Sequence, residues 1–353
     1  MPPRIVRRLI FAPLVIVITL GWIVLLPLLL VAAVVLTPSR LGRGRMVRLA
    51  LFSVAWLVLE SATLIASLGL WIASGFGGRL HTELYKERHY GLVRWFTGAL
   101  YPVITRLFKV TVEVEEPELT PEEAAARLTR PVLVLSRHAG PGDSFLIIHT
   151  MLSRYRRRPC IVMKGVLQFD PGLDVVINRL PHAFVWPGKG SSSGVVEEIR
   201  RLAAGLGNTD ALLLFPEGGN FTHGRRERAI ARLEESGQHE AAARARGMSN
   251  LLAPRTAGVV AAIEAAPTAD VILVAHTGLD DLITVRDIWR SIPMEQTVRS
   301  RWWRVPAAEI PQGRDEQVAW LYGWWEKIDH WIEEHRPVRE SAEPAAQAPG
   351  GGG

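Results

Sequence analysis

The 353-residue chain is long enough for one large domain or two ordinary ones. Its residues are 48% hydrophobic and 22% charged, a mixture that indicates a membrane part joined to a soluble part. The formal net charge of +6 suits an anionic lipid surface, and no aromatic-plus-basic motif supports nucleic acid as a partner. The single cysteine, Cys160, excludes an intrachain disulfide, and no Cys/His cluster has the spacing of metal ligands.

The N-terminal part of the chain is apolar. No charged residue occurs from Leu9 to Thr37, a run longer than the ~20 residues that span a bilayer as a helix. A second apolar run extends from Leu49 to Phe76 and contains one charge, Glu60, which we expect at an interface or paired within a helical hairpin. Residues 1–78 are therefore predicted to form a membrane-embedded segment of one helix, two helices or a re-entrant hairpin.

Basic residues flank the first apolar run on both sides, so positive charge does not select an orientation. Two spanning helices would separate the two basic clusters, whereas a re-entrant segment would keep both at the cytoplasmic face. We expect everything after Gly77 on the cytoplasmic side. Residues 79–109 are basic and aromatic, which predicts a helix lying on the membrane or an ordinary surface helix packed on the domain.

The rest of the chain alternates short strands with helices. Strands are expected at residues 110–114, 132–135, 160–163, 183–186, 211–214 and 271–275, and helices at 121–128, 144–153, 193–204, 225–246, 256–264 and 315–335. This alternation predicts an α/β fold. In the last helix a stripe of Trp320, Trp324, Ile328 and Trp331 favours core packing over interfacial anchoring. We expect one soluble domain at 79–336 and a disordered tail at 337–353.

Two turns that follow buried strands carry the candidate functional groups. In the stretch Ser136–Phe145, His138 and Asp143 lie five positions apart, which suits a general base and the carboxylate that orients it. In the stretch Leu212–Phe221, Glu217 lies within a Pro-Glu-Gly turn. Functional groups tend to sit where the chain leaves a sheet, so we expect these two turns to share one site.

At these turns the sequence resembles the glycerolipid acyltransferases that acylate lysophosphatidic acid and related lysophospholipids. The family's first block is a His, four residues and an Asp, which His138 and Asp143 match; its third block is Phe-Pro-Glu-Gly, which residues 215–218 match. Residues 252–256 resemble a later block around a Pro, and residues 320–324 resemble members that act on lysophospholipids. The resemblance covers roughly residues 105–335 and implies a mixed central sheet flanked by helices.

The resemblance implies a membrane-bound O-acyltransferase in phospholipid biosynthesis or remodelling. It would move a fatty acyl group from acyl-CoA or acyl-carrier protein to a hydroxyl of a lysophospholipid such as 1-acylglycerol-3-phosphate. His138 would act as general base, and Asp143 would hold the imidazole tautomer. Glu217 and Gly218 would shape the acceptor pocket. Backbone N–H groups in the turn at residues 140–143 and at the start of the following helix would stabilise an oxyanion. The hydroxyl would attack the thioester directly, so no covalent intermediate, metal or cofactor is expected.

Several positions depart from the family's pattern. Arg137 stands where an Asn usually precedes the His, and Gly219 and Asn220 replace a Thr and the Arg that is linked to the acceptor phosphate. The second block normally ends in an Arg, where this chain continues into Lys189. We expect the phosphate to meet other basic residues, and the candidates are Arg137, Lys189, Arg225 and Arg226. An acceptor that lacks this phosphate is the alternative.

Two other functions compete with acyl transfer. The segment Gly190–Gly194 matches the G-x-S-x-G nucleophile elbow, and Asp280 and His330 follow Ser192 in a workable order for a triad. These residues predict a membrane-associated serine hydrolase, although a Ser- and Gly-rich helix cap explains the motif as well. A lipid-binding or scaffold protein that kept the fold without activity is the third possibility.

Overall fold

The computed structural model describes residues 2–36, 44–118, 120, 129–140, 142–186, 192–280, 282 and 285–336. A seven-stranded sheet with the order β1-β7-β6-β2-β5-β3-β4 forms its centre. Its strands are β1 (Val110–Glu115), β2 (Val132–Ser136), β3 (Arg158–Lys164), β4 (Ala183–Val185), β5 (Asp210–Leu214), β6 (Asp270–Thr277) and β7 (Gln296–Val305). Strands β2 to β6 are parallel, whereas β7 runs antiparallel to β6 and parallel to β1. The predicted α/β fold with a mixed sheet is confirmed.

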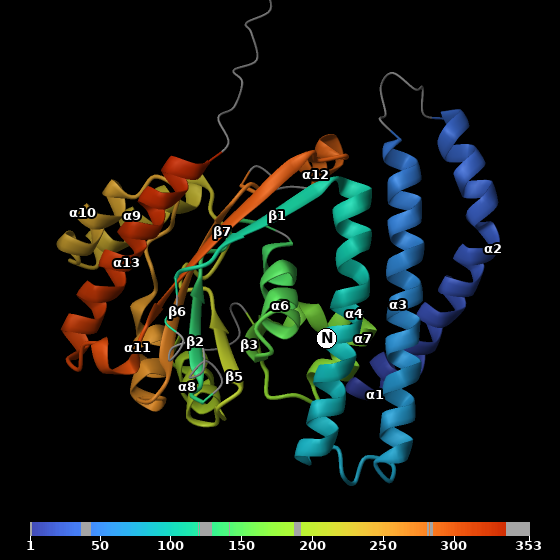
Figure 1. The fold of residues 1–353 in the computed structure, drawn as a ribbon, viewed down its shortest axis with the longest axis horizontal. Coiled ribbons are helices and arrows are strands. Elements are labelled where there is room, and N and C mark those ends of the chain that lie inside the picture. Colours follow the sequence, from blue (N-terminus) through green and yellow to red (C-terminus); the bar gives the residue numbers. More distant parts are fainter. Residues whose placement is uncertain are drawn as a thin grey trace, which may run out of the picture.

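Helices cover both faces of this sheet (Figure 1). Side chains of β2 alternate between the faces: Leu133 and Leu135 pack toward one layer of helices, whereas Val132 and Val134 pack toward α6 (Asp143–Ser153). The layer on the Leu133 face consists of α8 (Ser192–Ala204), α9 (His223–Glu235), α10 (His239–Gly247), α11 (Thr256–Ala265) and α13 (Arg314–His335). Because β2 is buried on both faces, the turn that follows it is held by the core.

The α6 side of the sheet also carries the N-terminal helices (Figure 1). These are α1 (Arg4–Val6), a π-helical turn (Arg7–Phe11), α2 (Ala12–Leu36), α3 (Arg45–Ala73) and α4 (Glu83–Phe108). Helix α7 (Pro171–Ile177) fastens them to the domain. Arg7 forms a buried ion pair with Asp174 at 2.6 Å, and Glu60 of α3 accepts the N–H of Gly172 at 2.6 Å. Glu60 therefore binds α7 and not a partner within the hairpin.

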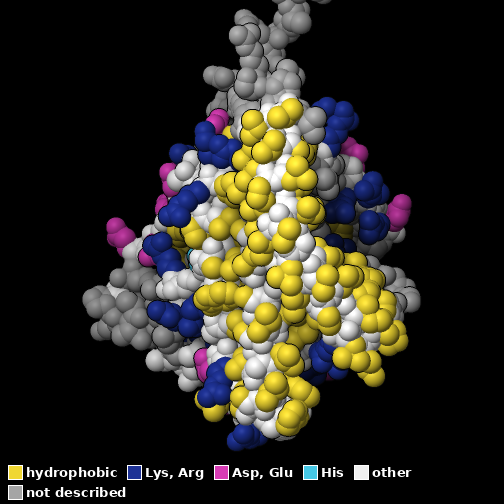
Figure 2. Space-filling model, turned by 90° about the vertical axis from the view of Figure 1, so that its right-hand side faces the viewer, with side chains coloured by type: hydrophobic (Ala, Val, Ile, Leu, Met, Phe, Trp, Pro, Cys, Tyr) yellow, Lys and Arg dark blue, Asp and Glu magenta, His cyan; other side chains and the backbone are white. Residues whose placement is uncertain are grey.

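Helices α2 and α3 present an apolar face. Residues Arg4–Val35 and Arg45–Ala73 are long and apolar enough, by length and composition, to cross a membrane. Figure 2 shows a broad band of hydrophobic side chains along this face of the molecule, with Lys and Arg on both flanks. Many large apolar side chains of α2 are exposed; among them are Leu20, Val24, Leu28, Val31 and Val35. An exposed apolar surface of this extent marks an interaction site.

Three expectations about secondary structure need correction. The single helix expected at 225–246 is two helices, because Gly237 adopts a left-handed conformation with φ of 75° and separates α9 from α10. Strand β7 was not predicted, since its arginines obscure the apolar alternation; Arg299 and Arg301 pair with Glu113 and Glu115 of neighbouring β1. Also not predicted from the sequence were α7, α12 (Val285–Ser291) and two short 3-10 helices at Gly165–Phe169 and Ala307–Glu309.

The tryptophan stripe of α13 packs on the core, as expected. Ile328 and Trp331 are buried, and Trp320 and Trp324 are half-buried against the same cluster. The helix expected at 121–128 and the tail at 337–353 lie outside the described residues.

Candidate active site

His138 and Asp143 meet at the carboxyl end of β2. The chain leaves the strand after Ser136, turns, and enters α6 at Asp143. His138 Nδ1 lies 2.9 Å from Asp143 Oδ2. An ionised carboxylate can only accept hydrogen bonds, so Nδ1 carries the proton and Nε2 is left as a proton acceptor. The His138 side chain is 20% exposed and stacks at a tilt on Phe215, with ring centroids 4.6 Å apart.

The Asp143 carboxylate is held in its charged form. Its Oδ2 also accepts the N–H groups of Ala139 at 2.9 Å and Gly140 at 3.3 Å, and its Oδ1 accepts the N–H of Ser144 at 2.5 Å. Burial alone would raise the pKa of Asp143, but the hydrogen bonds from the His138 ring and the Gly140 N–H oppose it, and the pKa lies below its usual value. The Gly140 N–H serves this carboxylate, although the sequence analysis counted it among the oxyanion donors.

Arg137, His276 and Asp280 form a buried group beneath the catalytic turn, which we call the support cluster. The Arg137 guanidinium is 1% exposed and pairs with Asp280 Oδ1 at 2.6 Å. Arg137 Nη1 also donates to the carbonyl of His276 at 2.7 Å. His276 Nε2 lies 3.2 Å from the Arg137 carbonyl and 3.9 Å from Asp143 Oδ2. Burial and the charge of Arg137 lower the pKa of His276, which favours the neutral ring.

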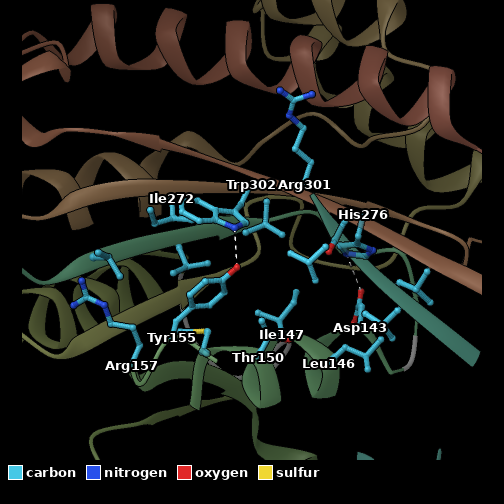
Figure 3. A pocket seen from close by; sticks show the side chains of 18 of the residues that line it. Asp143, Leu146, Ile147, Thr150, Tyr155, Arg157, Ile272, His276, Arg301 and Trp302 are labelled. Carbon is cyan, nitrogen blue, oxygen red and sulfur yellow. Dashed lines mark hydrogen bonds and ion pairs between the residues drawn. The ribbon is translucent and has the colours of Figure 1, made fainter. Parts of the chain in front are cut away.

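A small apolar cavity of about 140 Å³ lies between α6 and the sheet. Figure 3 shows Asp143 and His276 at one end of it and the pair Tyr155–Trp302 toward the other. Trp302 Nε1 donates to Tyr155 Oη at 2.8 Å. Asp143 therefore borders an apolar space on the α6 side, which keeps water from part of its surroundings.

Glu217 joins the two turns on which the site is built. Its Oε1 accepts the N–H of His138 at 2.9 Å, and its Oε2 accepts the N–H of Leu252 at 2.9 Å. Burial raises the pKa of Glu217 to about 7, against the opposing effects of Arg137 and these two donors. From the sequence, Glu217 was expected to shape the acceptor pocket together with Gly218. In the structure its buried carboxylate accepts a backbone N–H at each oxygen and so holds the turn at His138 next to the segment at Leu252.

A large cavity of about 1040 Å³ opens in front of His138. Gly218, Gly219 and Asn220 line it beside the histidine, so the structure brings the second turn to the same site. Its apolar wall comes from several helices and includes Trp56, Val93, Phe96, Phe145, Ile148, Leu173, Val176 and Ile199. The long apolar helix α3 thus contributes to the cavity that contains the dyad.

Two cationic side chains line this cavity in the described part of the chain, Lys164 and Arg255. Lys164 ends β3. Neither was given a role from the sequence. Lys164 is the last residue of β3, directly after a run of apolar residues, and this pattern could have identified it. Arg255 lies in residues 252–256, which resemble a later block of the family, but the arginine itself was given no function.

The basic residues proposed from the sequence lie elsewhere. Arg137 is buried and paired with Asp280, so it does not reach the cavity as a phosphate ligand. Arg226 donates to the carbonyls of Met248 and Arg246. Arg225 is exposed, and its Nη1 donates to the Asn220 carbonyl at the cavity rim at 3.0 Å. Lys189 lies outside the described residues.

The residues of the rival hydrolase triad are not assembled in the described part of the chain. Asp280 is engaged by Arg137, and His330 is exposed on α13 and pairs with Glu334 at 3.2 Å. Ser192 begins α8, while residues 187–191 lie outside the described residues.

A His–Asp pair at a strand end, facing a cavity with apolar walls, is the arrangement that general-base chemistry requires. Residues 111–276 match the family model described as Acyltransferase, so this part of the chain is similar to that family. No curated protein matches the sequence. Among solved structures, the chain is similar to the 1-acyl-sn-glycerophosphate (LPA) acyltransferase, PlsC, from Thermotoga maritima. The identity is 14%, the TM-score is 0.40, and the match covers 77% of this chain and 98% of that one.

Proposed function

We propose that the protein is a membrane-bound O-acyltransferase that moves a fatty acyl group from acyl-CoA or acyl-carrier protein to a hydroxyl of a lysophospholipid. The observation that carries this proposal is the His138–Asp143 pair, 2.9 Å apart, at the edge of a cavity of about 1040 Å³. His138 Nε2 has no partner among the described residues, so it is free to take a proton from a bound hydroxyl.

The reaction needs one base and no nucleophile from the protein. His138 Nε2 takes the proton of the acceptor hydroxyl as its oxygen attacks the thioester carbonyl carbon. The tetrahedral intermediate then expels the thiolate, which receives the proton from the imidazolium. Asp143 holds Nδ1 and stabilises the imidazolium while it exists. Product ester and free thiol are released, and the dyad returns to its starting protonation.

The cavity suits a long acyl chain. Its volume of about 1040 Å³ slightly exceeds the range of about 300–1,000 Å³ that is common for ligand sites. Aliphatic and aromatic side chains of α3, α4, α7 and α8 form its wall. A hydrocarbon chain bound there is removed from water, which favours binding by roughly 0.8 kcal/mol for each buried methylene.

The membrane attachment is proposed from α2 and the outer face of α3. Their exposed apolar side chains require an apolar environment, and a lipid bilayer supplies one for helices of this length. Because Trp56 of α3 lines the cavity, a lipid acceptor would reach His138 from the bilayer.

An acyl-transfer assay on the full chain in detergent–lipid mixtures tests the function. Long-chain acyl-CoA and acyl-carrier protein serve as donors, and 1-acylglycerol-3-phosphate is the first acceptor. We expect His138→Ala to lower kcat by about 10²–10⁴. His330→Ala is the matched control, and both it and Ser192→Ala should retain full activity. Loss of activity in Ser192→Ala with retention in His138→Ala would establish the hydrolase instead.

Cytoplasmic placement of the domain after Gly77 is the final part of the proposal. The only cysteine, Cys160, is buried, so the chain provides a low background for labelling. A cysteine introduced at the exposed position His239 should react in intact cells only with membrane-permeant reagents. Reaction with an impermeant reagent would place the domain on the opposite side.

A further inference from the structure

We propose that Arg255 binds the phosphate monoester of the acceptor lipid above the Gly218–Gly219 turn, with Arg225 as a second cation at the rim. The inference rests on the proposed acyl transfer to a lysophospholipid and identifies the head-group chemistry. It also accounts for the missing family arginine at position 220, where this chain has Asn220.

Arg255 is held against the second turn by its backbone and its side chain. Its N–H donates to the Pro216 carbonyl at 2.8 Å. Gly218 has a φ of 68°, and a Cβ added there would lie 2.6 Å from Arg255 Nε. The guanidinium therefore rests on the Gly218 backbone, in space that only a glycine leaves open.

The Arg255 guanidinium lines the cavity and forms no ion pair among the described residues. Arg137, in contrast, is paired with Asp280. Arg255 is exposed, and a guanidinium without an ion-pair partner at the wall of a ligand cavity offers several N–H donors in one plane, which matches the oxygens of a phosphate.

A second guanidinium approaches the same turn. A Cβ added to Gly219 would lie 3.1 Å from Arg225 Nη1, and the same nitrogen donates to the Asn220 carbonyl. Arg225 comes from α9 and Arg255 from the segment before α11, so two separate elements bring positive charge to one turn. Two cations complement a monoester, whose charge approaches −2 at neutral pH, better than a diester with a single charge.

The proposed phosphate site at Arg255 and the base His138 are connected through Glu217. Glu217 bridges the N–H of His138 and the N–H of Leu252, three residues before Arg255. A phosphate held at Arg255 would therefore fix the acceptor relative to His138. Such positioning raises the rate by presenting the hydroxyl in a reactive orientation.

Acceptor kinetics on the full chain test the assignment. The acceptors are 1-acylglycerol-3-phosphate, the phosphocholine diester with the same acyl chain, and 1-acylglycerol without phosphate. We expect Arg255→Gln to raise KM for the monoester by about 10–100-fold, the range for a lost charge-assisted hydrogen bond. KM for 1-acylglycerol should not change. Arg228→Gln, which removes an exposed arginine from the same α9 helix, is the matched control and should match the wild type.

A rescue variant separates charge relocation from a general loss of structure. Asn220→Arg introduced into Arg255→Gln restores a guanidinium at the position that the family uses. We expect it to recover most of the affinity for the monoester. Arg255→Lys keeps the charge without the planar fork and should lie between wild type and Arg255→Gln.

Two outcomes would overturn the assignment while leaving acyl transfer intact. One is an equal loss for all three acceptors in Arg255→Gln. The other is a monoester-selective loss in Lys164→Gln, the other cation that lines the cavity, with none in Arg255→Gln. If His138→Ala retains full activity, or no acceptor is acylated, the proposed function itself fails.

Discussion

The two arginines beside the catalytic turn have opposite environments. Arg137 is buried in the support cluster, where Asp280 and the carbonyl of His276 take its donors. Arg255 faces the cavity and has no acidic partner in the described residues. The same type of side chain therefore serves two purposes. Arg137 stabilises the turn from within the core, and Arg255 presents positive charge to the cavity. Burial and pairing, and not residue type, distinguish a structural arginine from a binding one.

The largest effect is expected at Asp143, where the support cluster and the cavity meet. Asp143→Asn should lower kcat by about 10²–10⁴ with little change in KM, because an amide no longer selects the histidine tautomer with the proton on Nδ1. Steady-state acyl-transfer kinetics measure this directly. A loss confined to KM would show that Asp143 acts in binding, contrary to its hydrogen bond with His138.

The support cluster should matter for stability. Arg137→Met leaves Asp280 buried without its cation, which typically costs about 3–5 kcal/mol. Arg137→Met/Asp280→Leu removes both charges and should recover most of that loss. Denaturant unfolding of the full chain in detergent measures both variants. If the two substitutions destabilise additively, Arg137 and Asp280 are not energetically coupled.

Glu217 should make a smaller contribution to the stability of the folded protein, and this contribution depends on pH. Its pKa is raised from 4.5 to about 7, so the folded protein retains a proton that the unfolded chain has released between these values. The contribution of this proton to stability is complete below about pH 4.5 and is lost as pH rises through about 7. Glu217→Gln should flatten the fall in melting temperature between pH 5 and pH 8.

The same substitution lowers stability at every pH. A glutamine accepts hydrogen bonds through one oxygen only, so the N–H of His138 or of Leu252 loses its partner. The expected cost is about 1–3 kcal/mol, the penalty for a buried donor left unsatisfied. An unchanged pH profile in Glu217→Gln would show that another group titrates in this range.

The sequence predicted the contact between His138 and Asp143 because both residues lie within one short segment. His138 and Asp143 share the turn between β2 and α6, and a spacing of five residues sets their geometry. The strands around them were equally predictable, since buried parallel strands are continuous runs of Val and Leu. Strand β7 was missed because its arginines are neutralised by β1, a partner that is distant in sequence.

The binding residues were harder to predict because their roles depend on contacts between distant segments. Arg137 adjoins the base in sequence, but Asp280 and His276 draw its side chain into the core. Arg255 lies 117 positions after His138 in the numbering, and only folding brings it to the same cavity. Glu217 was expected to face the acceptor, yet its two backbone partners occupy both oxygens.

The absence of a side chain at Gly218 has a consequence for searches that rely on sequence motifs. The glycine leaves room for a guanidinium that comes from another loop, so positive charge at this turn need not come from position 220. A search with a motif that requires Thr-Arg after Pro-Glu-Gly would not detect a chain of this kind.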